Sequence, residues 1–81
     1  MVEVLELRRR GKRWLLDWCQ FDFKEEGDLG IIAVTTRDKR NFEEEIKAFG
    51  EILEKKFPNY VGYMYVEFNG SFNCFYMFKN V

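Results

Sequence analysis

The sequence of 81 residues contains no histidine, only one serine and only two cysteines. Histidine is the commonest general base and the commonest metal ligand, so its absence removes the usual form of both kinds of site. Ser71, Cys19 and Cys74 therefore have no histidine to activate them as nucleophiles. The phosphate-binding patterns GxxxxGK[ST] and GxGxxG are also missing. We expect a protein that is not an enzyme and that uses no metal or other cofactor.

The two cysteines are far apart in the sequence and form no CxxC motif. We expect Cys19 and Cys74 to be reduced and buried as small apolar side chains, as is usual in a cytoplasmic protein. A single long-range disulfide is the alternative. One glutamine and one serine stand against ten glutamates and seven lysines, a bias found in proteins that work at high temperature.

Long apolar runs and a charge excess are lacking as well. The longest uncharged stretch, residues 68–78, is too short to cross a bilayer, and Glu3 and Glu6 do not fit a signal peptide. Thirteen basic and fourteen acidic residues leave a net charge of −1, so the whole chain has no strong attraction for nucleic acid or anionic lipid. The sequence predicts one cytoplasmic domain, residues 1–81, with no membrane partner.

Aromatic residues are abundant, and they concentrate in residues 60–78. Asn69-Gly70 in the middle of this stretch is typical of a two-residue type I′ turn, which predicts a hairpin in which Phe68 faces Ser71. One face of this hairpin carries Gly62, Met64, Val66, Phe68, Ser71, Asn73, Phe75 and Met77, and the other carries Val61, Tyr63, Tyr65, Glu67, Phe72, Cys74, Tyr76 and Phe78, with Val61 opposite Phe78. Because neither face is polar, both need to be covered.

Residues 2–8 and 13–23 have the pattern of two strands, which a tight turn at Arg10-Gly11 would join. This register pairs Leu5 with Leu16, Leu7 with Trp14, Arg8 with Arg13 and Arg9 with Lys12. A three-residue loop would instead place Glu3 against Asp17, a like-charge pair that costs stability. We therefore favour the register with the shorter turn.

The middle of the chain predicts a charged turn at residues 24–28, a buried strand at 29–36 and one helix at 41–57. Asn41 and Glu44 have the spacing of an approximate capping box, and Pro58 ends the helix. The apolar stripe of the helix consists of Phe42, Ile46, Phe49, Ile52, Leu53 and Phe57.

The expected fold is α+β in the order β-β-β-α-β-β, a five-stranded, mainly antiparallel sheet with one helix packed on one face. Five strands at ~4.8 Å spacing span about 19 Å, whereas a helix with its side chains is about 10–12 Å wide. One helix cannot cover such a sheet. The sheet could curl on itself, pair with a second copy or bind another molecule, and exposed aromatic area of this size is unusual in a monomer.

A basic cluster lies at the predicted tip of the first hairpin and consists of Arg8, Arg9, Arg10, Lys12 and Arg13. Facing cations repel each other unless an anion lies between them, and a nucleic-acid backbone supplies regularly spaced anions. A protruding basic ribbon can enter a groove of DNA or RNA. The alternative is a solvated turn whose charges oppose association of sheet edges.

The segment Gly62–Phe68 (GYMYVEF) resembles the RNP1 segment of RNA-recognition motifs. Gly62, Tyr63, Tyr65, Val66 and Phe68 fit that pattern, whereas Val61 and Met64 depart from it. The resemblance implies that Tyr63 and Tyr65 stack on bases. As ordinary strand residues, the same side chains would pack in a core or an interface.

Five further aromatic residues are candidates for a self-association interface: Trp14, Trp18, Phe72, Tyr76 and Phe78. Together these features predict a small non-enzymatic binding protein that contacts DNA or RNA through the basic tip and the sheet aromatics and that self-associates. The alternative is a protein-interaction or assembly module that uses its aromatic sheet face and has no nucleic-acid role.

Overall fold

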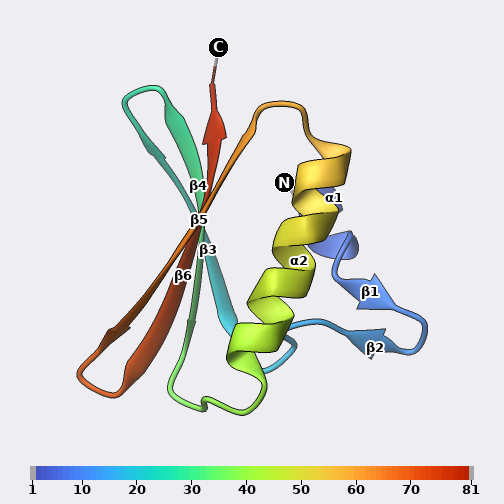
Figure 1. The fold of residues 1–81 in the computed structure, drawn as a ribbon, viewed down its shortest axis with the longest axis vertical. Coiled ribbons are helices and arrows are strands. Elements are labelled where there is room, and N and C mark those ends of the chain that lie inside the picture. Colours follow the sequence, from blue (N-terminus) through green and yellow to red (C-terminus); the bar gives the residue numbers. More distant parts are fainter. Residues whose placement is uncertain (1, 81) are drawn as a thin grey trace.

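A computed structural model describes residues 2–80 of the chain (Figure 1). In order, its elements are α1 (Val2–Glu6), β1 (Arg9–Arg10), β2 (Arg13–Trp14), β3 (Gln20–Glu26), β4 (Leu29–Thr36), α2 (Phe42–Lys56), β5 (Tyr60–Phe68) and β6 (Ser71–Lys79). The fold is α+β, as predicted. The prediction of one five-stranded sheet is wrong, because the strands form a two-stranded ribbon, β1-β2, and a four-stranded antiparallel sheet in the order β3-β4-β6-β5.

The β5-β6 hairpin confirms the predicted register from the turn as far as Gly62 opposite Met77. Asn69 and Gly70 both have positive φ, 51° and 75°, as a type I′ turn requires. The register then shifts, so that Tyr60 and not Val61 lies opposite Phe78. The extra residue is a β-bulge beside Gly62, whose φ of 152° is accessible to glycine.

The two strands predicted at residues 2–8 and 13–23 are wrong. The first is mostly the short helix α1, and the second is interrupted between β2 and β3. In the ribbon that remains, Arg9 pairs with Trp14 and Arg10 with Arg13, so the predicted pairs of Leu5, Leu7, Arg8 and Arg9 do not form. Leu16 lies at a φ of 60°, which ends any extended run there.

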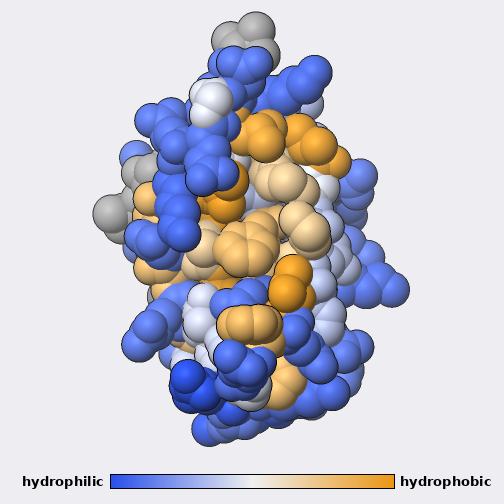
Figure 2. Space-filling view, turned by 90° about the vertical axis from the view of Figure 1, so that its left-hand side faces the viewer, coloured by the Kyte–Doolittle hydropathy of each residue, from blue (hydrophilic) through white to orange (hydrophobic). Residues whose placement is uncertain are grey.

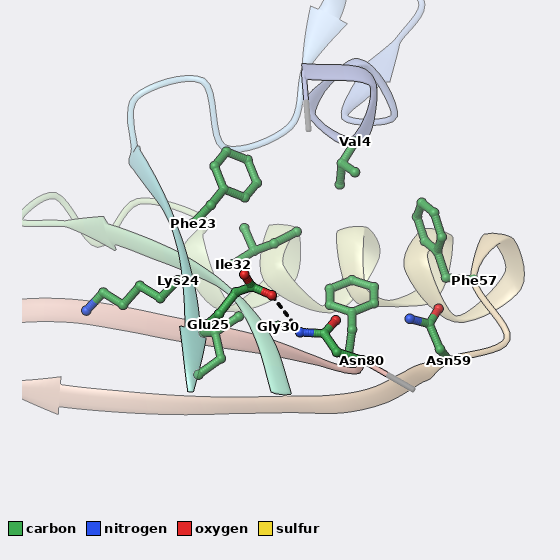
Figure 3. A pocket seen from close by; sticks show the side chains of 11 residues that line it. Val4, Phe23, Lys24, Glu25, Gly30, Ile32, Phe57, Asn59 and Asn80 are labelled. Carbon is green, nitrogen blue, oxygen red and sulfur yellow. Dashed lines mark hydrogen bonds between the residues drawn. The ribbon is translucent and has the colours of Figure 1, made fainter. Parts of the chain in front are cut away.

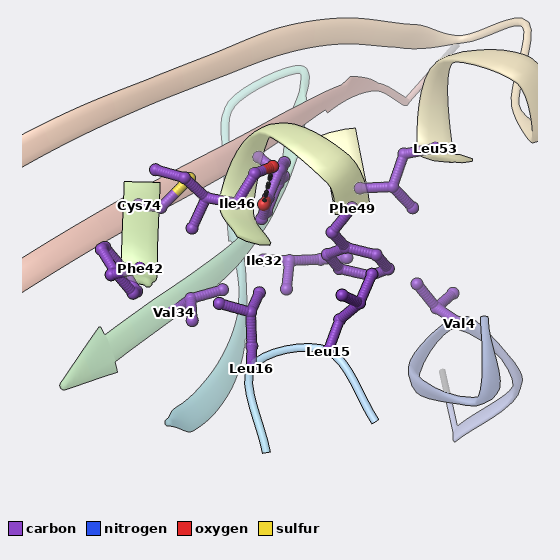
Figure 4. Close-up of a cluster of buried hydrophobic side chains, with 11 residues drawn as sticks. Val4, Leu15, Leu16, Ile32, Val34, Phe42, Ile46, Phe49, Leu53 and Cys74 are labelled. Atoms are coloured by element: carbon purple, nitrogen blue, oxygen red, sulfur yellow. Dashed lines mark hydrogen bonds between the residues drawn. The ribbon is translucent and has the colours of Figure 1, made fainter. Parts of the chain in front are cut away.

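This N-terminal segment forms part of the cover of the sheet. Helix α2 contacts β5 and β6, while Leu15 and Leu16 pack against Ile32 and Val34 of the same sheet face (Figure 4). The core between the two layers consists of Val4, Leu15, Leu16, Ile32, Val34, Phe42, Ile46, Phe49, Leu53, Cys74 and Tyr76. Because one helix is too narrow for four strands, the residues predicted as extra strands fold beside α2 instead and widen the cover.

The buried carboxylate of Glu45 fastens this segment to α2. Its Oε1 accepts the backbone N–H of Leu16 at 2.6 Å, and its Oε2 accepts a hydrogen bond from the guanidinium of Arg13. The bond to Leu16 helps to hold that residue at its positive φ, which is unfavourable for a residue with a branched side chain.

Helix α2 has nearly the predicted bounds and buries the predicted stripe, with Tyr76 donating a hydrogen bond to the Ile46 carbonyl at 2.6 Å. Asn41 is the N-cap residue, but its side chain makes no cap hydrogen bond, so the capping box with Glu44 is not formed. Strand β4 has the predicted bounds. The charged turn predicted at 24–28 is shorter, because residues 24–26 continue β3.

Candidate functional site

The sheet face opposite α2 carries a continuous apolar surface that no element within residues 2–80 covers (Figures 1 and 2). We call it the open face, and its apolar residues are Leu29, Ile31, Ala33, Met64, Val66, Phe68, Phe75 and Met77. Met64 is 51% exposed and Phe68 is 67% exposed. Their strand neighbours Tyr63 and Tyr65 point to the other side, as the two-residue period of a strand requires.

Strand β3 gives the open face a charged border. Asp22, Lys24 and Glu26 lie opposite Ala33, Ile31 and Leu29 of β4, so these three exposed charges share the open face. Along β3 the charges alternate in sign, negative, positive and negative. The open face is therefore charged along β3 and mainly apolar from β4 to β5, where Thr35, Ser71 and Asn73 add polar side chains.

The two edge strands of the sheet also differ in the number of their charged residues. Strands β3 and β5 both lie at an edge. Edge strands are commonly protected from pairing by charged side chains. Strand β3 has Asp22, Lys24, Glu25 and Glu26, whereas β5 has one charge, Glu67. The β5 side of the sheet is thus the less protected side.

Two of the five cations in the predicted basic tip, Arg8 and Arg13, have contacts with residues outside the β1-β2 ribbon. The guanidinium of Arg8 lies 4.3 Å from the ring centre of Phe21 and donates to the carbonyl of Leu15 at 2.8 Å, and partial burial lowers its pKa. Arg13 pairs with Glu45. Neither side chain is free to contact a phosphate without losing these interactions.

The other three cations remain at the surface. Arg9 lies 5.8 Å from the Trp14 ring centre and donates to the carbonyl of Gly11 at 3.1 Å. The side chains of Arg10 and Lys12 are exposed and have no hydrogen bond or ion pair to any other described residue. The positive tip is thus reduced to three side chains on the β1-β2 ribbon.

Tyr63 and Tyr65 lie on the covered face of the sheet. The Tyr65 ring centre is 5.7 Å from that of Phe42, and its hydroxyl donates to Glu67 at 2.7 Å. Tyr63 is 40% exposed and packs 5.6 Å from Tyr76. In Figure 1 the β1-β2 ribbon lies beyond α2 from the sheet, so the basic tip and the two tyrosines do not form one surface.

The aromatic residues predicted for an interface also have intramolecular partners. Tyr76 is fully buried, and Phe78 packs edge-to-face on Phe57 at 5.7 Å. The remaining contacts are Phe72 with Phe42 at 6.5 Å, Trp14 with Arg8 at 5.6 Å, and the Trp18 indole N–H with the Asp38 carbonyl at 2.8 Å. The covered layer thus includes Trp18, Phe72, Tyr76 and Phe78, whereas Trp14 is half-buried on the β1-β2 ribbon.

The cysteines are free, so the disulfide alternative is wrong. Cys74 is buried and Cys19 is half-buried, and burial raises the pKa of each thiol to about 12. Both are therefore protonated at neutral pH and poor nucleophiles. Residues 2–80 contain no cluster of three or more histidine, cysteine or acidic side chains that could hold a metal ion, and no described helix is long and apolar enough to span a membrane.

Comparison with known proteins adds no relative, because no family model, curated protein or solved structure matches the chain. The open face is the feature that the sequence prediction left unassigned. One signal could have identified it: this hairpin face includes the small or polar residues Gly62, Ser71 and Asn73, whereas the other face carries more large rings. A helix buries more area on the face with the larger rings.

Proposed function

We propose that this protein is a self-associating module in which the open face docks against the open face of a second copy. The observation that supports this best is the exposed apolar surface around Met64, Phe68 and Phe75, which has no cover within residues 2–80. Exposed apolar patches of several hundred Å² commonly mark an interaction site. Both described helices, α1 and α2, lie on the other side of the sheet.

The charged border of the open face favours a second copy over an unrelated partner. In a symmetric dimer, if residue i of the first copy contacts residue j of the second, then residue j of the first copy contacts residue i of the second. The alternation of Asp22, Lys24 and Glu26 suits such a contact, because Lys24 of each copy can face an acidic residue of the other. A face of one charge sign would repel itself.

The size of the face is sufficient for a small dimer. Four strands that each take up ~4.8 Å of width and contain seven to nine residues at ~3.3 Å per residue give roughly 500 Å² per copy. Two copies then bury about 1,000 Å² or more, the lower end of specific interfaces. The expected complex is a dimer that dissociates on dilution.

The test is sedimentation over a range of protein concentrations with the double variant Met64→Lys, Val66→Lys. Two cations on the apolar part of the contact would be desolvated against two more, so we expect the dimer dissociation constant to rise at least about a hundredfold. Val61→Lys is the matched control, since Val61 is exposed at the bulge of the same strand. A wild-type protein that is monomeric at every concentration, or a double variant that still dimerises, would contradict the proposal.

We propose nucleic-acid binding as a second candidate function, supported by one observation. The side chains of Arg10 and Lys12 are exposed and unpaired among the described residues, and Arg9 is beside them. Three cations on a projecting ribbon could contact a phosphate backbone without help from Tyr63 or Tyr65.

Binding of a labelled oligonucleotide at low and moderate salt tests this candidate. Arg10→Ala with Lys12→Ala should weaken binding and reduce the magnitude of the salt slope by roughly 2, one for each lost phosphate contact. Lys55→Ala with Lys56→Ala removes the same charge from the end of α2 and should have less effect. Equal losses in the two variants would mean that the ribbon is not a specific site.

A further inference from the structure

A cavity of about 670 Å³ opens between α1, the end of α2 and the covered face of the sheet (Figure 3). Most of its lining lies on the covered side of the sheet, and Lys24 and Ile31 of the open face border it at the sheet edge. A cavity of this size is in the range that holds a small organic molecule.

The walls of the cavity are mainly aromatic. Phe23 extends from β3, Phe57 follows α2 and Phe78 extends from β6, with Ile32 between them and Val4 of α1 across the opening (Figure 3). The rings of Phe57 and Phe78 are fixed in an edge-to-face contact. Such rings offer an apolar surface, and their faces attract organic cations.

The polar end of the cavity is rich in acceptors. Glu25 Oε1 accepts a hydrogen bond from the Asn80 side-chain amide at 2.9 Å, and Glu25 has no ion pair with any residue in 2–80. Asn59 donates its amide to the Lys79 carbonyl at 3.0 Å. Each asparagine thus uses one N–H of its amide on the protein, and in Figure 3 their amide oxygens point toward the phenylalanine walls.

Among the described residues, the cavity lining carries one acidic side chain, Glu25, and one basic side chain, Lys24. Lys24 also borders the cavity, but its amine extends away from Glu25 and the asparagines in Figure 3. The negative charge of Glu25 therefore has no cation beside it inside the cavity. A carboxylate, amide oxygens and phenylalanine rings around one space are complementary to a positively charged ligand with an apolar body.

We infer that this cavity binds a small organic cation, an alkylammonium or arylalkylammonium compound whose apolar part contacts the phenylalanines and whose ammonium group contacts Glu25. The ammonium hydrogens are donors, so they match the acceptors that Glu25, Asn59 and Asn80 present. An anion of the same shape would be repelled by Glu25.

Three probes of nearly equal size test the inference: phenylpropylamine, which is a cation at neutral pH, phenylpropanol and phenylpropionate. Binding is followed by titration calorimetry or by amide chemical shifts of residues around the cavity. We expect the amine to bind about tenfold more tightly than the alcohol, as for one charge-assisted hydrogen bond, and the carboxylate to bind most weakly.

Two pairs of variants locate the site. Glu25→Gln should reduce the affinity for the amine about tenfold, whereas Glu26→Gln, on the next residue and the other sheet face, should leave it unchanged. Phe23→Ala should weaken all three probes, and Phe68→Ala, on the open face, should weaken none. Thermal unfolding of each variant confirms that it is folded.

Any of three results would overturn the inference. The first is no detectable binding of the amine to the folded wild-type protein. The second is equal affinity for the amine and the carboxylate. The third is a Glu25→Gln variant that is folded and binds the amine as tightly as the wild type. None of these results bears on self-association, because Phe23 and Glu25, which the variants change, lie on the covered face of the sheet and not on the open face.

Discussion

The two faces of the four-stranded sheet are both apolar in sequence, yet only one of them is buried. Tyr76 of β6 is completely buried under α2, while its neighbours Phe75 and Met77 are partly exposed on the other side. The same difference separates Tyr65 from the more exposed Met64 in β5. An apolar pattern along a strand therefore indicates that a side chain favours burial, but the cover that is available decides which side chains achieve it.

The cover shows how a small chain divides its apolar residues. Helix α2 and the N-terminal segment lie on one face, and Glu45 links them through Leu16 and Arg13. A third element would be needed to bury the other face, and the described part of the chain does not contain one. The open face thus depends on the number of covering elements among the described residues as much as on composition.

The largest expected effect comes from removing a ring on the covered face, compared with removing a ring on the open face. Phe49→Ala, in the buried layer, should lower the free energy of unfolding by about 3–5 kcal/mol, because it leaves a cavity among well-packed side chains. Phe68→Ala, on the open face, should change it by no more than about 0.5 kcal/mol. Urea titration at a dilution where the protein is monomeric measures both. Similar losses for the two variants would mean that the open face is also covered.

Alkaline pH should produce the next largest effect, and it should act on the covered face. Burial raises the pKa of the Cys74 thiol from 9.0 to about 12, so the folded state favours the protonated form. This stabilisation is complete below about pH 9 and is lost as the pH rises toward 12, by roughly 3 kcal/mol at about pH 11.

The measurement is the free energy of unfolding against pH under reducing conditions. Cys74→Ala should flatten the alkaline part of this curve, although it also removes buried sulfur and lowers stability at neutral pH. Any residual slope belongs to groups such as Cys19 and Tyr60, whose pKa values burial also raises to about 12. A curve that is unchanged by Cys74→Ala would contradict the burial of this thiol.

The smallest expected effect comes from removing a single tyrosine hydroxyl group. Tyr76→Phe removes the hydrogen bond to the Ile46 carbonyl and leaves that buried oxygen with one partner fewer, at a cost of about 1 kcal/mol. Tyr63→Phe, on the neighbouring strand, removes a hydroxyl from a side chain that is 40% exposed and should have almost no effect. Equal values for the two variants would show that the bond to Ile46 is replaced by water.

Local sequence signals were sufficient for three elements. Asn69-Gly70 predicted the register of β5 and β6 as far as Gly62, the apolar spacing predicted α2, and the uncharged run predicted β4. They failed at residues 2–18. The alternation of leucines and charged residues there is typical of a strand, but these residues form a short helix, a short ribbon and an irregular segment that cover the sheet. The candidate sites show the same limit, because composition identified the basic tip but not the structural contacts of Arg8 and Arg13.

The sequence by itself determined which residues favour burial, where the final hairpin turns and where the main helix begins and ends, since each depends on neighbours within a few positions. Only the tertiary structure decided which sheet face the helix covers and that the N-terminal segment completes this cover. It also decided that the face of Met64, Phe68 and Phe75 stays open. The physical reason is that one covering layer is available for two apolar faces, and packing between residues that are distant in the chain determines which face it buries.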